Sequence, residues 1–172
     1  MIEIIKNRNI EYYLDLDFIK NIGLTGNFTR QTVHFIFKLK LQKLQFLYLN
    51  RNNLSSLDFL EALECPNLIS FWAIENHLIS FNGLSKLKYK NNIKRINLKD
   101  NNIKNIDDED LPNFISQFEN LNLLVLANNR INWDTSNNSK KKKKINDKFK
   151  DLRFIFEITK DNKIYLKEDS YT

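Results

Sequence analysis

The sequence offers few side chains that could carry out acid–base, nucleophilic or metal chemistry. Its 172 residues contain two histidines, His34 and His77, and one cysteine, Cys65. It has no Gly-x-Ser-x-Gly turn, no cysteine pair and no glycine-rich phosphate loop, and only three glycines in all. We expect His77 to be a surface side chain and Cys65 to be a packed thiol rather than a nucleophile. The sequence therefore predicts a protein that is not an enzyme and needs no cofactor.

Four consecutive acidic residues, Asp107 to Asp110, are the one group that could be considered for a divalent metal ion. Ion-binding loops space their ligands along the chain, whereas these four are adjacent. Acidic side chains just before a proline, here Pro112, are instead typical of a helix N-terminus, where carboxylates meet free N–H groups and the positive end of the helix dipole. We expect a helix to begin there and no metal site.

The elements that position the remaining side chains are indicated by a repeat. Residues 44–54 carry the order Leu-x-x-Leu-x-Leu-x-x-Asn-x-Leu, and the chain shows five such registers, with a polar last member in the first. They start at residues 19, 44, 68, 93 and 121, so the steps are 25, 24, 25 and 28 residues. A recurrence of this length is typical of units that cannot bury their apolar face alone and must stack on copies of themselves.

The slots of the repeat predict where side chains point. Because side chains alternate across a strand, the fourth and sixth residues should point inward. The Asn should end the strand and bond backbone groups of the turn and of the neighbouring coil, which have no regular partner there. We therefore expect a buried asparagine ladder, made of Asn27, Asn52, Asn76, Asn101 and Asn129.

The five registers resemble the leucine-rich-repeat family, and in particular its short-repeat intracellular subclass, over about residues 19–133. The resemblance implies an α/β fold, a right-handed solenoid with a curved parallel sheet on its concave face. It also implies an activity limited to binding other proteins. The whole chain is then one domain, divided into an N-terminal cap (1–18), five repeats (19–133), a lysine-rich loop (134–150) and a C-terminal cap (151–172).

Several segments outside the strands allow more than one interpretation. Residues 1–18 could be a cap strand or a degenerate sixth repeat, and residues 31–43 could be a strand or a helix. Apolar residues three apart after Leu54 and after Leu78 fit a helix or tight turns. Near the C-terminus, LRFIFEI and KIYLK could be two strands joined by a polar turn, or Phe149 could begin a sixth coil.

Charge and cysteine content predict the setting of the protein. The net charge is +6, but residues 135–172 hold 11 basic and 6 acidic residues, so the repeats are nearly neutral. The run Lys140–Lys144 reads as a solvated insertion, although a nuclear-import signal or a nucleic-acid contact stays possible. No apolar run reaches 18 residues and no cysteine pair exists. We expect an intracellular monomer, cytoplasmic or nuclear, with no membrane contact.

The third, fifth and seventh slots should point out of the sheet, and the eighth should lie at its rim. Outward residues in the second and third copies are bulky, and we expect Phe46, Tyr48, Trp72 and Ile74 to lie side by side in open surface. The other outward residues include Arg95, Lys99, Leu123, Val125 and Ala127, and the rim residues are Gly26, Arg51, Glu75, Asp100 and Asn128.

Exposed aromatic residues with arginine nearby are typical of binding hot spots. The sequence predicts a protein-binding site, made of Phe46, Tyr48, Trp72, Ile74, Arg51, Arg95, Lys99 and Val125. Two alternatives stay open. The aromatics could be covered by the terminal segments or by self-association. They could also stack on RNA bases while the basic residues contact phosphates, as in a ribonucleoprotein.

Overall fold

The computed structural model describes residues 20–26, 41–104, 110–131 and 153–155. Several predictions lie outside these residues. They are the cap at 1–18, most of the segment 31–43, the lysine-rich loop, most of the C-terminal cap, and the residues Asn27, His34 and Asp107–Glu109.

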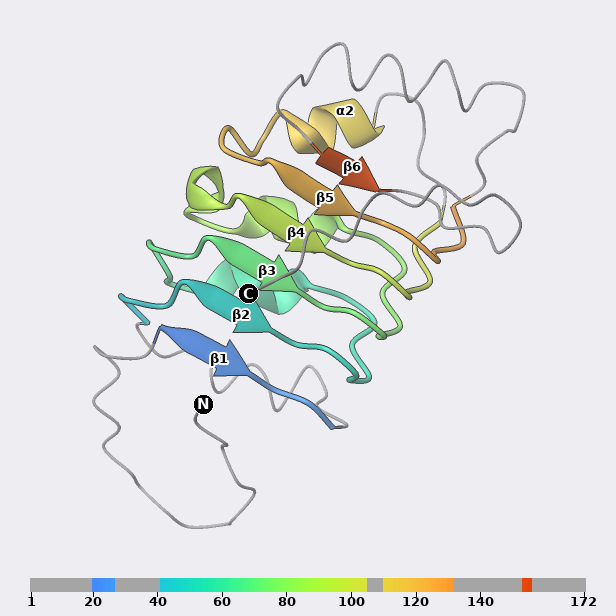
Figure 1. Cartoon of the computed structure of the whole chain (residues 1–172), viewed down its shortest axis with the longest axis horizontal. Coiled ribbons are helices and arrows are strands. Elements are labelled where there is room, and N and C mark those ends of the chain that lie inside the picture. The colour runs from blue at the N-terminus through green and yellow to red at the C-terminus, as the bar shows by residue number, and fades with distance from the viewer. Residues whose placement is uncertain (1–19, 27–40, 105–109, 132–152, 156–172) are drawn as a thin grey trace.

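One parallel sheet runs through the described residues. Its six strands are three residues long and follow one another in chain order, with every neighbouring pair parallel (Figure 1). The strands are β1 (Asn21–Gly23), β2 (Phe46–Tyr48), β3 (Ser70–Trp72), β4 (Arg95–Asn97), β5 (Leu123–Val125) and β6 (Arg153–Ile155). The pairing joins equivalent positions of successive copies, so each slot of the sequence pattern forms a row across the sheet.

The core lies on one side of this sheet, where the inward slots meet the connecting segments. The middle residue of each strand from β1 to β5 is buried, and so is the residue two places later, as the alternation predicts. These residues are Ile22, Leu47, Phe71, Ile96 and Leu124, followed by Leu24, Leu49, Ala73, Leu98 and Leu126. They belong to a single apolar cluster that extends from Ile22 to Leu126.

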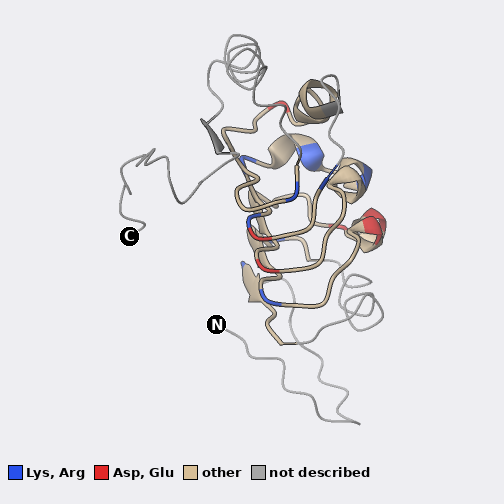
Figure 2. Cartoon of the chain, turned by 90° about the vertical axis from the view of Figure 1, so that its right-hand side faces the viewer, with Lys and Arg blue, Asp and Glu red and all other residues tan. Residues whose placement is uncertain are grey.

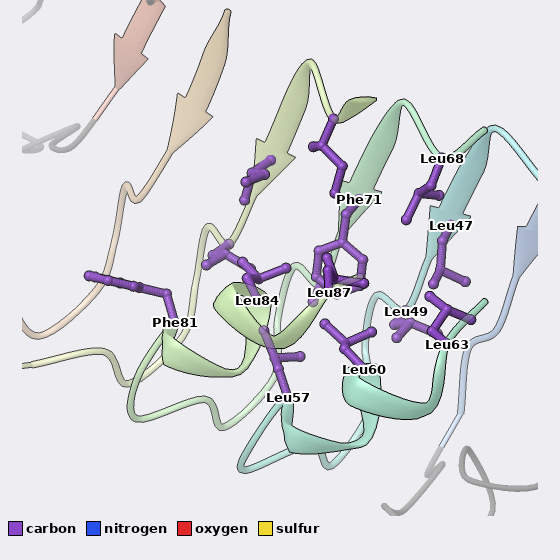
Figure 3. Packing of buried hydrophobic residues seen from close by; sticks show 14 of the residues in the cluster. Leu47, Leu49, Leu57, Leu60, Leu63, Leu68, Phe71, Phe81, Leu84 and Leu87 are labelled. Atoms are coloured by element: carbon purple, nitrogen blue, oxygen red, sulfur yellow. The ribbon is translucent and has the colours of Figure 1, made fainter. Parts of the chain in front are cut away.

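The segments that connect β2 to β3 and β3 to β4 form short 3-10 helices rather than long α-helices. These are η2 (Asp58–Ala62), η3 (Asn82–Lys86) and η4 (Lys90–Asn92). A 3-10 helix has three residues per turn, so apolar residues three apart lie on one of its sides. Leu57, Leu60 and Leu63 from the segment around η2 are buried, as are Phe81, Leu84 and Leu87 around η3, and all six belong to the core cluster (Figure 3). Of the two expected alternatives, a helix or tight turns, these segments therefore form the tight turns.

Neighbouring 3-10 helices pack so closely that one contact requires glycine. A Cβ atom added to Gly83 in η3 would lie 2.5 Å from the carbonyl carbon of Leu57, at the start of η2. Real Cβ atoms essentially never approach backbone this closely. Gly83 therefore sets the distance between two successive copies on the side of the sheet that carries the core.

The single α-helix of the described residues, α2 (Asp110–Ile115), begins at the last residue of the acidic cluster, with Pro112 in its first turn. This start agrees with the expected helix N-terminus. Phe114 of α2 packs between Phe81 and Phe118, with ring centroids 4.3 and 4.9 Å away. The helix therefore continues the core beyond η3.

The last strand adds one further parallel member to the sheet. β6 pairs with β5 in parallel, with Leu124 opposite Phe154. This pairing is the one expected of a sixth coil, whereas residues 163–167 (KIYLK), the second strand of the other interpretation, lie outside the described residues. Over the ranges described above, no helix is long and apolar enough to cross a membrane.

Candidate functional site

The turn that ends each strand from β2 to β5 is held by an asparagine. Asn52, Asn76 and Asn101 are buried and Asn129 is half-buried. Each donates from Nδ2 to a carbonyl of the preceding coil, at 2.8–2.9 Å, and to carbonyls of its own turn. The Oδ1 atoms of the last three accept backbone N–H groups from the preceding coil, at 3.0–3.2 Å. These asparagines form a ladder that links successive coils, and it fixes where each strand stops.

The residue before each ladder asparagine has a left-handed backbone. Arg51, Glu75, Asp100 and Asn128 have φ between 54° and 56°, and Gly26 has φ of 100°. Four of the five N–H groups at these positions donate to a backbone carbonyl of the next coil, two or three residues after the end of its strand, such as Glu75 to Lys99 at 3.1 Å. The sequence predicts these five as rim residues, but it does not predict their conformation. Gly26, Asp100 and Asn128 belong to residue types that tolerate a positive φ well. These residue types were the signal in the sequence for a left-handed backbone at the rim.

Alternation across the strands creates a second surface, which we call the outer face. It is the side of the sheet opposite the core, formed by the first and third residues of the strands. In β1 to β5 these are Asn21, Gly23, Phe46, Tyr48, Ser70, Trp72, Arg95, Asn97, Leu123 and Val125. The face changes in character along the sheet, from small and polar at β1 to aromatic at β2 and β3, basic at β4 and aliphatic at β5.

Three aromatic rings contact one another on the outer face. Phe46 and Tyr48 stack with centroids 6.4 Å apart and planes 17° apart. Tyr48 meets Trp72, its partner in register, edge to face at 5.3 Å and 83°. The three rings are half-buried, as is Ile74, whose N–H donates to Asn50 Oδ1 at 2.9 Å. We call Phe46, Tyr48, Trp72 and Ile74 the aromatic patch. Its residues lie outside the core cluster, as the register predicts, but they are half-buried and not in the open surface that the sequence led us to expect.

Val125 corrects the predicted site. It points to the outer face but is only 7% exposed. With Leu123 and Ala127 it forms an apolar cluster that is separate from the main core. Alternation gives the direction of a side chain and carries no information about whether something covers it. The aliphatic end of the outer face is thus buried, and Val125 is not available to a partner in this structure.

The basic residues predicted for the site differ in their surroundings. Arg51 donates to both carboxylate oxygens of Glu75 at 3.2–3.3 Å, and Lys99 Nζ lies 3.4 Å from Asp100 Oδ2. Asn128 also donates to Asp100, at 2.7 Å. Figure 2 shows charges of both signs along the turns at one side of the sheet. Arg95 is exposed and takes part in no ion pair with the residues described. Two of the three expected cations are therefore partly neutralised at the rim.

Among the residues that the structure describes, reactive groups do not converge on this surface. Cys65 is buried, and burial raises the pKa of its thiol to about 12, so the thiol is neutral at pH 7. His77 is exposed, in the turn after β3. No three His, Cys, Asp or Glu side chains gather as metal ligands among the described residues. The outer face can therefore offer shape, apolar area and charge to a partner.

Comparison with known proteins adds no relative to this picture, because no protein-family model and no curated protein matches the sequence.

Proposed function

We propose that the chain is a right-handed leucine-rich-repeat solenoid whose parallel sheet forms a concave, protein-binding face. Four features support the solenoid. The strands pair in parallel and in chain order, equivalent slots are in register, and the asparagine ladder links each coil to the next. Connections between parallel strands of one sheet are also nearly always right-handed. The residues that line the outer face then determine what the protein binds.

The aromatic patch carries the functional proposal. Its three rings lie side by side on two adjacent strands, and they are half-buried on the outer face rather than packed in the core. Each large aromatic side chain can bury roughly 150–250 Å², and such residues dominate the energetics of interfaces. Because the three rings are already half-buried in the free chain, only part of this area is left for a partner, and the patch supplies a portion of the roughly 800 Å² per side of an ordinary protein interface. The function is that of a non-catalytic protein-interaction module.

The ionic contacts at the rim favour a protein partner over RNA. Nucleic-acid binding on this face would use Arg51, Arg95 and Lys99 to meet phosphates while the rings stack on bases. Arg51 and Lys99 are already held by carboxylates, and those carboxylates would repel a phosphate backbone. Affinity that falls steeply with salt concentration would indicate phosphate contacts, whereas an apolar interface would respond weakly.

A pull-down from an extract of the source cell tests this proposal. The native chain is compared with the double variant Tyr48→Ala, Trp72→Ala. A matched control, Ile79→Ala with Tyr89→Ala, removes large apolar side chains that are 57% and 36% exposed and lie off the outer face. Circular dichroism confirms that all three proteins are folded.

We expect specific partners to be retained by the native chain and by the control and to be lost from the Tyr48, Trp72 variant. Truncation at the centre of an interface should cost about 2 kcal/mol or more of binding free energy. Equal recovery by all three proteins would refute the site, and equal loss from both variants would show that exposed apolar area binds nonspecifically.

A further inference from the structure

Most of the acidic residues in the described part of the molecule take part in ion pairs. Ion pairs take up Arg51, Lys86, Lys88 and Lys99, and the acids they contact are Glu75, Asp58, Glu61, Glu64 and Asp100. Glu119 is the one further acidic residue whose side-chain exposure the structure describes, and it lies between α2 and β5, away from the strands. Among the described residues, the basic side chains outside these pairs therefore outnumber the acidic side chains outside them.

One of these cations stands on the outer face itself. Arg95 is the first residue of β4 and is exposed. Its partner in register is Ser70, and Ser70 is in turn paired with Phe46. Adjacent strands are about 4.8 Å apart, so Arg95 lies one strand from the aromatic patch and diagonal to Trp72.

Among the described residues of the outer face, none offers a carboxylate to Arg95. The first and third residues of β1 to β4 include no Asp or Glu, and the acids of the rim are held by Arg51, Lys99 and Asn128. Ser70, between Arg95 and Phe46, is 1% exposed and uncharged. Within the described strands β1 to β4, Arg95 is thus a cation beside an apolar patch, with no carboxylate on the same face.

The chemical groups of a partner that would fit Arg95 and the aromatic patch can be specified. A guanidinium group presents a planar fork of N–H donors that pairs with a carboxylate through two parallel hydrogen bonds. The rings beside it favour a bulky apolar side chain. In an extended chain, residues are about 3.3 Å apart along the backbone, so both groups can come from positions one to three residues apart in the same segment.

We infer that the partner binds through an acidic peptide segment, in which an Asp or Glu pairs with Arg95 and a neighbouring aromatic or aliphatic residue packs on Tyr48 and Trp72. This inference rests on the proposed protein-binding function and specifies the chemistry of its ligand. It also predicts that Arg95 determines which segments are accepted, while the aromatic patch supplies most of the affinity.

A selection experiment separates the two roles. A display library of short random peptides is selected on the full-length chain and, in parallel, on the Arg95→Glu variant. The control is Lys94→Glu, which makes the same charge change at an exposed neighbour whose side chain, by alternation, does not belong to the outer face. The same immobilised proteins are also offered a random single-stranded RNA library.

On the native chain and on Lys94→Glu we expect peptides in which an acidic residue lies one to three positions from a bulky apolar residue. On Arg95→Glu the acidic preference should disappear while the apolar preference stays. A peptide selected on the native chain should bind Arg95→Glu about tenfold more weakly in Kd, and added salt should weaken its binding to the native chain only.

Other outcomes distinguish this inference from the function on which it rests. Apolar peptides without acidic enrichment, or equal enrichment on all three proteins, would overturn the role of Arg95 and leave the protein-binding function in place. Enrichment of RNA with no peptide enrichment would overturn both.

Discussion

The side-chain amide of Asn76 donates a hydrogen bond of 2.8 Å to the carbonyl oxygen of Leu49, which lies 27 residues earlier in the sequence. Its Oδ1 accepts the N–H of Leu54 at 3.2 Å, so one buried side chain satisfies backbone groups on both sides of the preceding turn. Hydrophobic side chains of similar volume could fill the same space but could not replace these bonds.

Replacing Asn76 with Leu should therefore destabilise the protein by about 3 kcal/mol, because buried backbone donors and acceptors lose their partners. Urea denaturation measures the loss of unfolding free energy. The exposed Asn122→Leu change is the control and should shift this free energy by less than about 0.5 kcal/mol. Equal effects at the two positions would show that the ladder is not important for stability.

The contact of Gly83 with Leu57 gives a second stability test. Gly83→Ala places a Cβ atom 2.5 Å from a backbone carbon, so the two coils must move apart, and we expect a cost of about 2 kcal/mol. Gly23→Ala is the matched control because no atom lies within 4 Å of its added Cβ. In thermal unfolding, the native protein and Gly23→Ala should have similar melting temperatures, and the melting temperature of Gly83→Ala should be clearly lower. A Gly83→Ala protein as stable as native would contradict the close packing.

The left-handed backbone at Glu75 can be tested with two substitutions that both remove its ion pair with Arg51. Glu75→Gly suits a φ of 54°, whereas Glu75→Val places a β-branched residue in that conformation. Valine should be less stable than glycine by about 1–2 kcal/mol. If the two variants unfold at the same denaturant concentration, the turn does not require its positive φ.

Cys65 predicts a specific dependence of stability on alkaline pH. Burial raises the pKa of its thiol from an ordinary value near 9 to about 12. Between these values the unfolded chain has lost the thiol proton and the folded chain retains it, so the free energy of unfolding falls as pH rises. Lysine and tyrosine residues titrate in the same range, and comparison with Cys65→Ala isolates the contribution of the thiol.

The difference in unfolding free energy between native and Cys65→Ala should be constant below about pH 9 and should shrink from pH 9 toward pH 12. A constant difference across the whole range would mean that the thiol is accessible to water. Reaction with a thiol reagent at pH 8 provides an independent check, and it should be slow until the protein unfolds.

The repeat in the sequence predicts much of this architecture because each slot has a simple physical requirement. Leu47 and Leu49 must leave water, so they define the buried side of the strand, and the same alternation places Tyr48 on the opposite side. The three-residue spacing of Leu57, Leu60 and Leu63 fits a 3-10 turn, but the spacing alone did not exclude a helix.

Other features depend on contacts that a pattern does not contain. Val125 occupies the same slot as Trp72, yet its burial depends on what lies over it. Arg51 and Arg95 are both expected at the site, but the strand register brings only Arg51 against a carboxylate, that of Glu75. Pairwise charge contacts between coils become visible only when the coils are placed side by side.

The most direct test of the proposed binding face is site-specific photo-crosslinking. Tyr48 is replaced by benzoylphenylalanine, an aromatic residue that forms a covalent bond to whatever lies against it on illumination. The same replacement at Tyr89, an exposed tyrosine beside Lys88 and away from the outer face, is the control. With partner present, we predict crosslinks from position 48 and none from position 89. Partner bound to the Tyr48-substituted protein without a crosslink, or equal crosslinking from both positions, would contradict the assignment of the aromatic patch as the binding surface.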